Sequence, residues 1–403
     1  MRIAYLTQSY PPMISGAALV VEGLATAMAK RGHEVLVIAA SETGQAYRVQ
    51  EGNLTVIRLR SLHNPLRMGQ RFLLYPRAAV MHTLRAFAPE LIHVHDPVLL
   101  GWLSVEYAQR ANIPAVLTVH QLPSFVASYL PDLLRAQVIT LLWLYARWFA
   151  RKFSWLITPT QTIGELFMEM TGVPVGAISS GVNLETFHPL SLMEEAICTR
   201  RKWKLPLHAP ILLHVGRLDV EKRVDRVIRA AAGVLAQTDA HLLIVGDGSE
   251  KKNLLRLCDE LEIADRVHFT GFVSLREGLP ELYRVAHLFV TASEIETQGI
   301  VLLEAAASGL PIVAVRATCI PEIVHEGING FLFEPGDIQE TAVAMIFLLK
   351  NPGPAEGWGR ASRLVAEKHS RVSTLDAHET LYRDVIRRGC MRRVSWSPFR
   401  AKA

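Results

Sequence analysis

The feature that most constrains the fold is a pattern that occurs twice along the 403-residue chain. Short apolar runs rich in Val, Ile and Leu alternate with stretches in which apolar residues recur at helical spacing. Several of these runs are apolar throughout, which is typical of parallel strands buried on both faces. The pattern predicts an α/β protein with two doubly wound, Rossmann-like domains. The expected strands span residues 3–8, 34–40, 54–60, 91–96, 114–120 and 155–160, and then 211–218, 241–248, 266–273, 288–293 and 311–317.

The two patterns meet at GVNLETFHPLSLMEEA, where the periodicity is broken and where we place a linker near residues 185–200. We expect an N-terminal domain over residues 1–185 and a C-terminal domain over residues 186–375. A C-terminal helix and basic tail, residues 376–403, would pack back toward the N-terminal domain. Ligands of such sheets bind at the carboxyl ends of the strands, so we expect a ligand cleft between two facing domains.

Composition narrows the class of protein. Half of the residues are hydrophobic and 20% are charged, as in a folded globular protein. The four cysteines lack CxxC or zinc-like spacing and indicate reduced thiols in a cytosolic protein. We see no secretory signal and no apolar run of the roughly 18–20 residues that a spanning helix needs. The net charge of +5 is modest, and no nucleic-acid-binding module is evident.

Two loops could bind an anion. In QSYPPMISGAALVVEG, Gly16 stands where a helix begins, and the loop is either a phosphate site or an ordinary βα turn. In LLHVGRLDVEKRVD, Arg217 and Lys222 follow a strand near a helix start, which suits a diphosphate. The alternative is a solvated ion pair with Asp219 or Glu221. The next junction, IVGDGSE, is interpreted as architectural, and GxGxxG is absent from the first βα turn.

The segment SEIETQGIVLLEAAASG places Glu296 and Glu304 eight positions apart. We expect Glu296 in the loop after a strand and Glu304 inside a helix that runs from about Gln298 to Gly309. The backbone N–H groups of Gln298, Gly299 and Ile300 would form the start of that helix and hold a phosphate. A carboxylate on either side would accept from hydroxyl groups, so the segment predicts a nucleotide-diphosphate sugar as ligand.

Three histidines end strands in LIHVHDP and LTVHQLP. Strand alternation puts His93 and His95 on one face, where a structural role is more common than a catalytic one. His120 precedes a Gln-Leu-Pro loop and would lie at the cleft rim. No third ligand stands at a suitable spacing, so we expect no metal site.

These motifs, in this order, resemble the family 4 retaining glycosyltransferases, which have the GT-B fold. The resemblance covers nearly the whole chain. It rests on Glu296 and Glu304 as an E-x7-E motif, together with PPxxxGAA, TVH, SSGVNLETFHP, HVGRLDVEK, FTGFV, ASGLPIVA and PEIVHEGINGFLFEPGD.

The resemblance implies a role for each matching residue. Arg217 and Lys222 would hold the diphosphate, Glu304 the ribose hydroxyls, and Glu296 the hydroxyls of the donor sugar. The backbone of Phe272 and Val273 would contact the base, His120 would contact the sugar near the reacting carbon, and Gly16 would let its loop close over the phosphates. Many members carry Gly-Gly where this chain has Ser15-Gly16. The family lacks a metal-binding DxD motif, so no cofactor is expected besides the donor substrate.

The function implied is transfer of a hexose, with retention, to an acceptor hydroxyl. The ETQG variant resembles members that glycosylate diacylglycerol or related lipids, but soluble acceptors and polysaccharide assembly stay open. A non-catalytic nucleotide-sugar-binding protein is the alternative from another class, and a dehydrogenase is disfavoured by the missing GxGxxG.

We also expect docking on an anionic membrane surface from the cytoplasmic side. The evidence is clustered arginines and aromatic residues in 56–88 and 125–155 and an acid-free tail with Trp396 and Phe399. A buried crossover helix and a solvated arginine face explain the same residues equally well.

Overall fold

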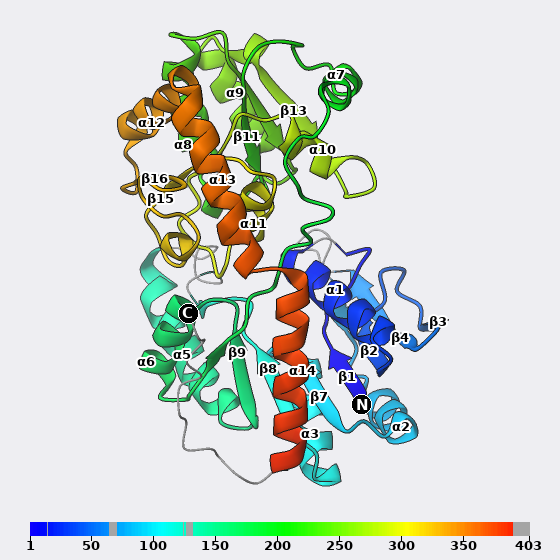
Figure 1. The fold of residues 1–403 in the computed structure, drawn as a ribbon. Coiled ribbons are helices and arrows are strands. Elements are labelled where there is room, and N and C mark those ends of the chain that lie inside the picture. The colour runs from blue at the N-terminus through cyan, green and yellow to red at the C-terminus, as the bar shows by residue number, and fades with distance from the viewer. Residues whose placement is uncertain (14, 64–70, 124, 126–131, 390–403) are drawn as a thin grey trace. The chain divides into compact units, whose positions relative to one another are not determined.

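A computed structural model describes residues 1–13, 15–63, 71–123, 125 and 132–389. The chain forms two compact units (Figure 1). Unit 1 comprises Met1–Ser179 and the chain from Thr374 onward, and unit 2 comprises Ser180–Ser373. Each unit is built on its own largely or wholly parallel sheet with helices between the strands, so the predicted α/β class with two doubly wound domains is confirmed.

The sheet of unit 1 has eight strands in the order β10-β9-β8-β7-β1-β2-β4-β3. All neighbours are parallel except β3 and β4, which form an antiparallel pair at one edge. A separate two-stranded sheet pairs β5 with β6. The bounds are β1 Arg2–Leu6, β2 Glu34–Ala40, β3 Tyr47–Glu51, β4 Leu54–Leu59, β5 Ser61–His63, β6 Arg71–Leu73, β7 Leu91–Val94, β8 Ala115–Thr118, β9 Trp155–Thr158 and β10 Gly176–Ala177.

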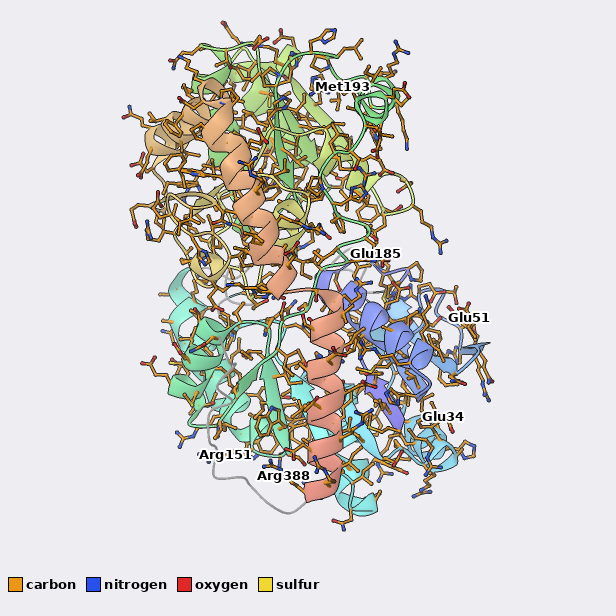
Figure 2. All side chains as sticks on the ribbon, viewed as in Figure 1. Glu34, Glu51, Arg151, Glu185, Met193 and Arg388 are labelled. Carbon is orange, nitrogen blue, oxygen red and sulfur yellow. The ribbon has the colours of Figure 1, made fainter. Side chains whose placement is uncertain are left out.

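Helix α14, Arg371–Arg388, completes the core of unit 1 with residues from the far end of the chain. Leu375, Tyr382 and Val385 of this helix belong to the same buried cluster as Ile3 and Tyr5 of β1. Figure 2 labels Arg388 at the end of the helix. The other helices of unit 1 are α1 Gly16–Lys30, α2 Arg77–Phe87, α3 Leu99–Ala111, α5 Asp132–Ala150 and α6 Gln161–Thr171.

The sheet of unit 2 has six parallel strands in the order β13-β12-β11-β14-β15-β16. Their bounds are β11 Ile211–Val215, β12 His241–Val245, β13 Val267–Gly271, β14 Leu288–Thr291, β15 Ile312–Val315 and β16 Gly330–Phe333. The helices are α7 Met193–Lys202, α8 Val224–Leu235, α9 Lys251–Glu260, α10 Leu279–Arg284, α11 Ile300–Ala307, α12 Ile338–Lys350 and α13 Pro352–Lys368. Three short 3-10 turns are η1 Val220–Lys222, η2 Ala264–Arg266 and η3 Ile320–Glu322.

Helix α7 corrects one expectation. The sequence placed a linker near residues 185–200, but residues 193–202 form a helix inside unit 2. Glu194 and Glu195 lie in its first turn and Arg200 to Lys202 in its last, so the charges complement the helix dipole. Arg200 is buried and donates to the carbonyls of Ala209 and Val285, which fixes the helix to the unit.

Candidate active site

Two neighbouring strands of unit 2 bring the main predicted residues together. Arg217 and Lys222 follow β11, and Glu296 follows β14. Because β11 and β14 are parallel neighbours, their carboxyl ends lie at the same edge of the sheet. Nζ of Lys222 lies 2.5 Å from Oε1 of Glu296, and both side chains are mostly buried, at 17% and 15% exposure. The structure therefore joins two predicted residues that are 74 positions apart.

Arg217 is held by two carboxylates. Its guanidinium contacts Asp219 and lies 2.5 Å from Oε1 of the buried Glu221. Asp219 also accepts from the backbone N–H of Ser249 at 3.1 Å. These ion pairs, with Asp219 and Glu221, are the alternative to a phosphate site that the sequence analysis left open. An incoming diphosphate would have to compete with them for the same guanidinium.

Helix α11 begins two residues later than predicted, at Ile300, and ends at Ala307. Gly299 precedes it with φ +73°, and a Cβ there would lie 2.7 Å from Cδ1 of Leu302. The left-handed backbone at position 299 is not helical, and the space beside it accommodates only glycine. Gln298 is buried, and its Oε1 accepts from the backbone N–H of Ser180 at 2.8 Å. Its side chain thus anchors the loop, which the sequence did not indicate.

Glu304 lies on α11 as predicted, and its carboxyl group accepts from the hydroxyl of Tyr283 at 2.8 Å. Burial raises the pKa of Glu304 to about 7, against the opposing effects of the Tyr283 hydrogen bond and the charge of Arg371. A carboxyl group with this pKa is partly protonated near neutral pH. It can therefore donate as well as accept a hydrogen bond.

Phe272 and Val273 follow β13, two strands away from β11 in the sheet. The side chain of Phe272 is 48% exposed and that of Val273 is buried. The role implied for them, a backbone contact to the base, stays a prediction.

The sequence analysis did not find the residues that hold the backbone of Glu296. The N–H of Glu296 donates to Oγ1 of Thr318 at 3.4 Å, and the thiol of Cys319 donates to the carbonyl of Glu296, also at 3.4 Å. Both residues follow β15, the strand next to β14. The available signal was their position just after a predicted strand of the same sheet.

His214 of β11 was also missed. It is buried, its Nδ1 lies 3.0 Å from the carbonyl of Val290, and its Nε2 has no partner among the described residues. Burial lowers its pKa to about 4, opposed by its hydrogen bond to Val290, and the charge of Lys222 lowers it further while that of Glu296 raises it. An uncharged imidazole therefore lies within electrostatic range of the Lys222–Glu296 pair.

The loop after β12 has the architectural role predicted for IVGDGSE. A Cβ on Gly246 would lie 1.8 Å from the carbonyl oxygen of Gly216. Only glycine allows the two loops to approach this closely. The close approach supports the loop that carries Arg217.

In unit 1, Gly16 is the first residue of α1, and Ser15 is its N-cap. The hydroxyl of Ser15 accepts from the N–H of Ala18 at 3.0 Å. The departure from Gly-Gly thus supplies a cap, an interaction that typically contributes about 1 kcal/mol to helix stability.

His120 follows β8 and is half-buried. Its Nε2 lies 2.8 Å from Nδ1 of His95, and burial, together with the neighbouring His378, lowers its pKa to about 4. His93 is fully buried, and its two ring nitrogens lie 2.6 Å from the hydroxyl of Tyr382 and 2.7 Å from that of Thr118. His93 therefore has the structural role that was predicted for it.

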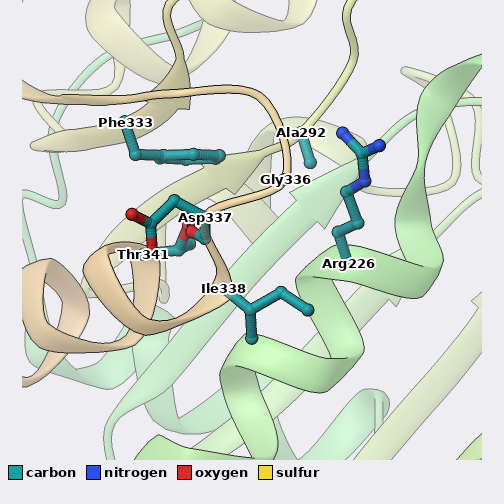
Figure 3. A pocket seen from close by; sticks show the side chains of 7 residues that line it. All are labelled: Arg226, Ala292, Phe333, Gly336, Asp337, Ile338 and Thr341. Atoms are coloured by element: carbon teal, nitrogen blue, oxygen red, sulfur yellow. Dashed lines mark hydrogen bonds between the residues drawn. The ribbon is translucent and has the colours of Figure 1, made fainter.

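A crevice in unit 2, shown in Figure 3, is lined by none of the predicted site residues. It lies beside α8, where Arg226 pairs with Glu294. The crevice is lined by Arg226, Ala292, Phe333, Gly336, Asp337, Ile338 and Thr341.

Across the described parts of the chain, no group of three His, Cys, Asp or Glu side chains is arranged to hold a metal ion.

Comparison with known proteins gives two family matches. Residues 14–186 match Glycosyltransferase Family 4, and residues 198–365 match Glycosyl transferases group 1. A GDP-mannose-dependent alpha-mannosyltransferase from Mycobacterium tuberculosis is 32% identical over 84% of this chain and 85% of its own. The chain belongs to the family 4 glycosyltransferases.

Other relatives of this family 4 glycosyltransferase are matched over different shares of their own length. An alpha-monoglucosyldiacylglycerol synthase from Acholeplasma laidlawii is 26% identical over 96% of this chain and 98% of its own. A sulfoquinovosyl transferase from Arabidopsis thaliana is 29% identical over 76% of this chain, and the match spans 59% of that relative.

Solved structures agree with the GT-B fold. Sucrose-phosphate synthase from Thermosynechococcus elongatus superimposes with a TM-score of 0.83 at 24% identity, over 96% of this chain and 99% of that one. Anabaena HepE in complex with UDP-glucose gives a TM-score of 0.75 at 22% identity, over 94% and 99%. The predicted GT-B architecture of two parallel-sheet α/β domains is therefore confirmed.

Proposed function

We propose that this glycosyltransferase moves a hexose from a nucleotide-diphosphate sugar to a hydroxyl group of a membrane lipid, with retention of anomeric configuration. The observation that carries the donor part is the Lys222–Glu296 pair at the carboxyl ends of β11 and β14, in which Glu296 stands four residues before the start of α11. This arrangement offers a cation for the diphosphate and a carboxylate for sugar hydroxyls within one loop cluster.

The donor we favour is UDP-glucose. Support comes from the neighbour HepE, whose structure contains UDP-glucose, and from the alpha-monoglucosyldiacylglycerol synthases, whose names state a glucosyl product. The match to a GDP-mannose-dependent enzyme makes GDP-mannose the second candidate.

In the transfer we propose, the bond between the anomeric carbon and the diphosphate oxygen breaks, and a bond to the acceptor oxygen forms on the same face. The acceptor proton passes to an oxygen of the departing diphosphate. Arg217 and Lys222 stabilise the charge that develops on this leaving group. Glu296 orients the sugar, Glu304 holds the ribose, and His120 contacts the sugar near the reacting carbon. The N–H groups from Gln298 to Ile300, together with Gly16, bind phosphate, and Phe272 and Val273 contact the base.

The acceptor we favour is diacylglycerol or a lipid-linked glycan. Two relatives are named alpha-monoglucosyldiacylglycerol synthase, and the match to one of them spans nearly both chains. A soluble acceptor is the alternative, and the two make opposite predictions for membrane binding.

A surface of unit 1 suits an anionic bilayer. Helix α5 exposes Leu134, Leu141, Leu144 and Trp148, which recur at helical spacing along one side. No acidic residue stands between Leu133 and Gly164. The cations of this surface, which we name the α5 patch, are Arg135, Arg147, Arg151 and Lys152, of which Arg151 is labelled in Figure 2.

The α5 patch has the composition of an interfacial helix. Nζ of Lys152 lies 4.1 Å from the ring centre of Trp148, which places a cation beside an amphipathic aromatic group. Each such cation near an anionic surface contributes about 1 kcal/mol to binding. Within the described ranges, no helix is both long and apolar enough to cross a bilayer.

The other segments that were predicted to dock provide less evidence for a membrane-binding surface. Arg58 of the 56–88 segment is buried and donates to the carbonyls of Tyr10 and Ala40, so it cannot meet a membrane. Residues 64–70 and 126–131 and the tail with Trp396 and Phe399 lie outside the described residues.

Docking is tested by sedimentation with neutral and anionic liposomes at low and high salt. We expect binding to anionic vesicles that weakens with salt and that is lost in a Leu141→Glu, Leu144→Glu double variant. Leu364→Glu, at an equally exposed position on α13, is the control. Equal recovery in the supernatant under all conditions would exclude docking and favour a soluble acceptor.

The enzymatic proposal is tested by a thermal-shift screen of UDP-glucose and GDP-mannose, followed by mass spectrometry of products formed on diacylglycerol vesicles. We expect a glycolipid in α configuration, equal turnover in excess chelator, and almost none in a Lys222→Ala variant. Donor binding without release of nucleoside diphosphate would favour a binding protein. Inactivation by chelator with rescue by magnesium or manganese would overturn the metal-independent step.

A further inference from the structure

Unit 1 contains a buried cluster of imidazole and phenol groups drawn from four distant segments. Tyr5 is on β1, His93 and His95 lie on and just after β7, His120 follows β8, and Tyr382 is on α14. The ring centres of His93 and His95 are 4.1 Å apart, and those of His95 and His120 are 5.1 Å apart. The family assignment gives no role to His95.

One contact in this cluster reaches a residue of the proposed site. Nδ1 of His95 lies 2.8 Å from Nε2 of His120, so a single proton is shared between the two rings. Nε2 of His95 is buried and has no hydrogen-bond partner among the described residues. Whether Nε2 of His95 is protonated therefore depends on which of the two rings donates the shared proton.

The two possible arrangements differ in free energy. If His120 donates, neutral His95 must carry its proton on Nε2, which leaves a buried N–H without an acceptor. If His95 donates from Nδ1, its Nε2 is a bare lone pair. Orphaned buried N–H groups are rarer than under-satisfied acceptors. The second arrangement is therefore favoured, and it requires His120 to be protonated on Nδ1.

The surroundings keep both rings uncharged. Burial lowers the pKa of His95 well below its ordinary value, and the neighbouring histidines lower it further. Asp96, the next residue, is occupied, since it accepts from Oγ1 of Thr7 at 2.9 Å and from the N–H of Gln8. The rings of Tyr5 on β1 and His93 on β7 face His95, and His378 of α14 acts electrostatically on both rings of the pair. Thr118 of β8 and Tyr382 of α14 contact His93 behind them.

We propose that His95 is a positioning residue for the transfer reaction, which donates from Nδ1 to Nε2 of His120 and thereby fixes the tautomer and orientation of that ring. The role rests on the proposed function, in which His120 contacts the donor sugar near the reacting carbon. A ring held in one tautomer presents the same nitrogen to the ligand in every turnover, which is the preorganisation that catalysis needs.

The test compares His95→Phe, which keeps the ring shape without the donor, with His95→Asn, whose amide nitrogen replaces Nδ1. Imidazole nitrogen NMR of histidine-labelled full chain reports the tautomer of His120, with His120→Gln for assignment. We expect His95→Phe to change the tautomer signal and to lower kcat by about 10- to 100-fold with KM for UDP-glucose nearly unchanged. The acid limb of its pH–rate profile should move to higher pH, because Nε2 of His120 is no longer blocked by a donor.

His95→Asn should restore the tautomer signal and most of kcat, whereas a purely structural role would show as equal losses of melting temperature in both variants. An unchanged tautomer signal in His95→Phe overturns the proposal, as does a changed signal with an unaltered pH–rate profile. Full activity of His120→Gln would instead refute the role of His120 in the proposed function, while the NMR result would still stand.

Discussion

The two units hold their candidate site residues in opposite electrostatic states. Unit 2 keeps its cations in ion pairs, Lys222 with Glu296 and Arg217 with Asp219 and Glu221. Unit 1 places His120 against the uncharged imidazole of His95, which is part of a buried cluster of imidazoles and phenols. A polyanionic ligand can replace the carboxylate in an ion pair and bind the cation itself. A network of neutral hydrogen-bonded rings instead holds each ring in one orientation. In the proposed reaction, unit 2 supplies charge to the leaving group and unit 1 fixes the orientation of the group that contacts the sugar.

The largest effect is expected from the cations of unit 2. Arg217→Ala or Lys222→Ala should lower the rate of transfer by about 10²–10³, because each removes positive charge from the departing diphosphate. Lys251→Ala, which removes a cation paired with Asp247 after the neighbouring strand, is the control. Steady-state kinetics measures the rate of transfer, and calorimetry measures the affinity for the donor. Donor affinity and rate that both survive in the double variant would show that unit 2 does not use its charge in this way.

A smaller loss of activity is expected when the negative charge of Glu296, the partner of Lys222, is removed. Glu296→Gln keeps the loop and a hydrogen-bonding group beside Lys222, but should reduce kcat by about 100-fold if the carboxylate orients the sugar. Glu294→Gln, two residues earlier and paired with Arg226, should have little effect. Turnover equal to that of the unaltered enzyme would remove Glu296 from the site.

The buried carboxyl group on α11 makes a prediction about stability and pH. Because the pKa of Glu304 is about 7 in the folded protein, folding takes up a proton and unit 2 loses stability as the pH rises through that value. Glu304→Gln should therefore raise stability at pH 8 by up to about 3 kcal/mol, and much less at pH 5. Melting curves at the two pH values measure this, with the exposed Glu356→Gln as control. A pH-independent difference would contradict the raised pKa.

The smallest effect is expected where α14 meets α1. Arg31 pairs with Asp376 at 2.7 Å and with Glu379 at 3.1 Å, and Glu379 also contacts His33. Although burial raises it, the pKa of Glu379 is lowered overall by His33 and Arg31, so its contribution is present at neutral pH and is lost on acidification. Glu379→Gln should destabilise unit 1 by about 1 kcal/mol at pH 7. Asp384→Asn, paired within α14, is the control, and an equal change in both variants would refute a tether to α1.

Most of the parallel strands were predictable because they are apolar throughout, and such runs differ visibly from the helical periodicity around them. In the two main sheets, strands β3, β10 and β16 were not predicted. Strand β3, YRVQE, is polar and exposed along most of its length, so it lacks a buried face to reveal it. Helix α7 was mistaken for a linker because its mean composition is polar, although its charges are ordered along the dipole.

The site was predictable residue by residue but not as a set of contacts. The positions of Glu296 and Lys222 after strands followed from the sequence. Their pairing depends on β11 lying next to β14 instead of in chain order, and sequence periodicity carries no information on strand order. The contact between His95 and His120 was hidden for the same reason, since it needs β7 beside β8. The support of Glu296 by Thr318 requires the neighbouring strand β15.

The return of the chain to unit 1 affects how the protein is made. Tyr382 and Leu375 complete the core around Tyr5, yet they are synthesised roughly 200 residues after the last strand of that sheet. At about 5–20 residues per second, this is an interval of roughly 10 to 40 seconds on the ribosome. During this interval unit 2 can fold to completion, because it is continuous in sequence, while the hydrophobic surface that α14 will cover is still open to solvent. The nascent chain is therefore expected to need a chaperone at that surface, and to release it when α14 emerges.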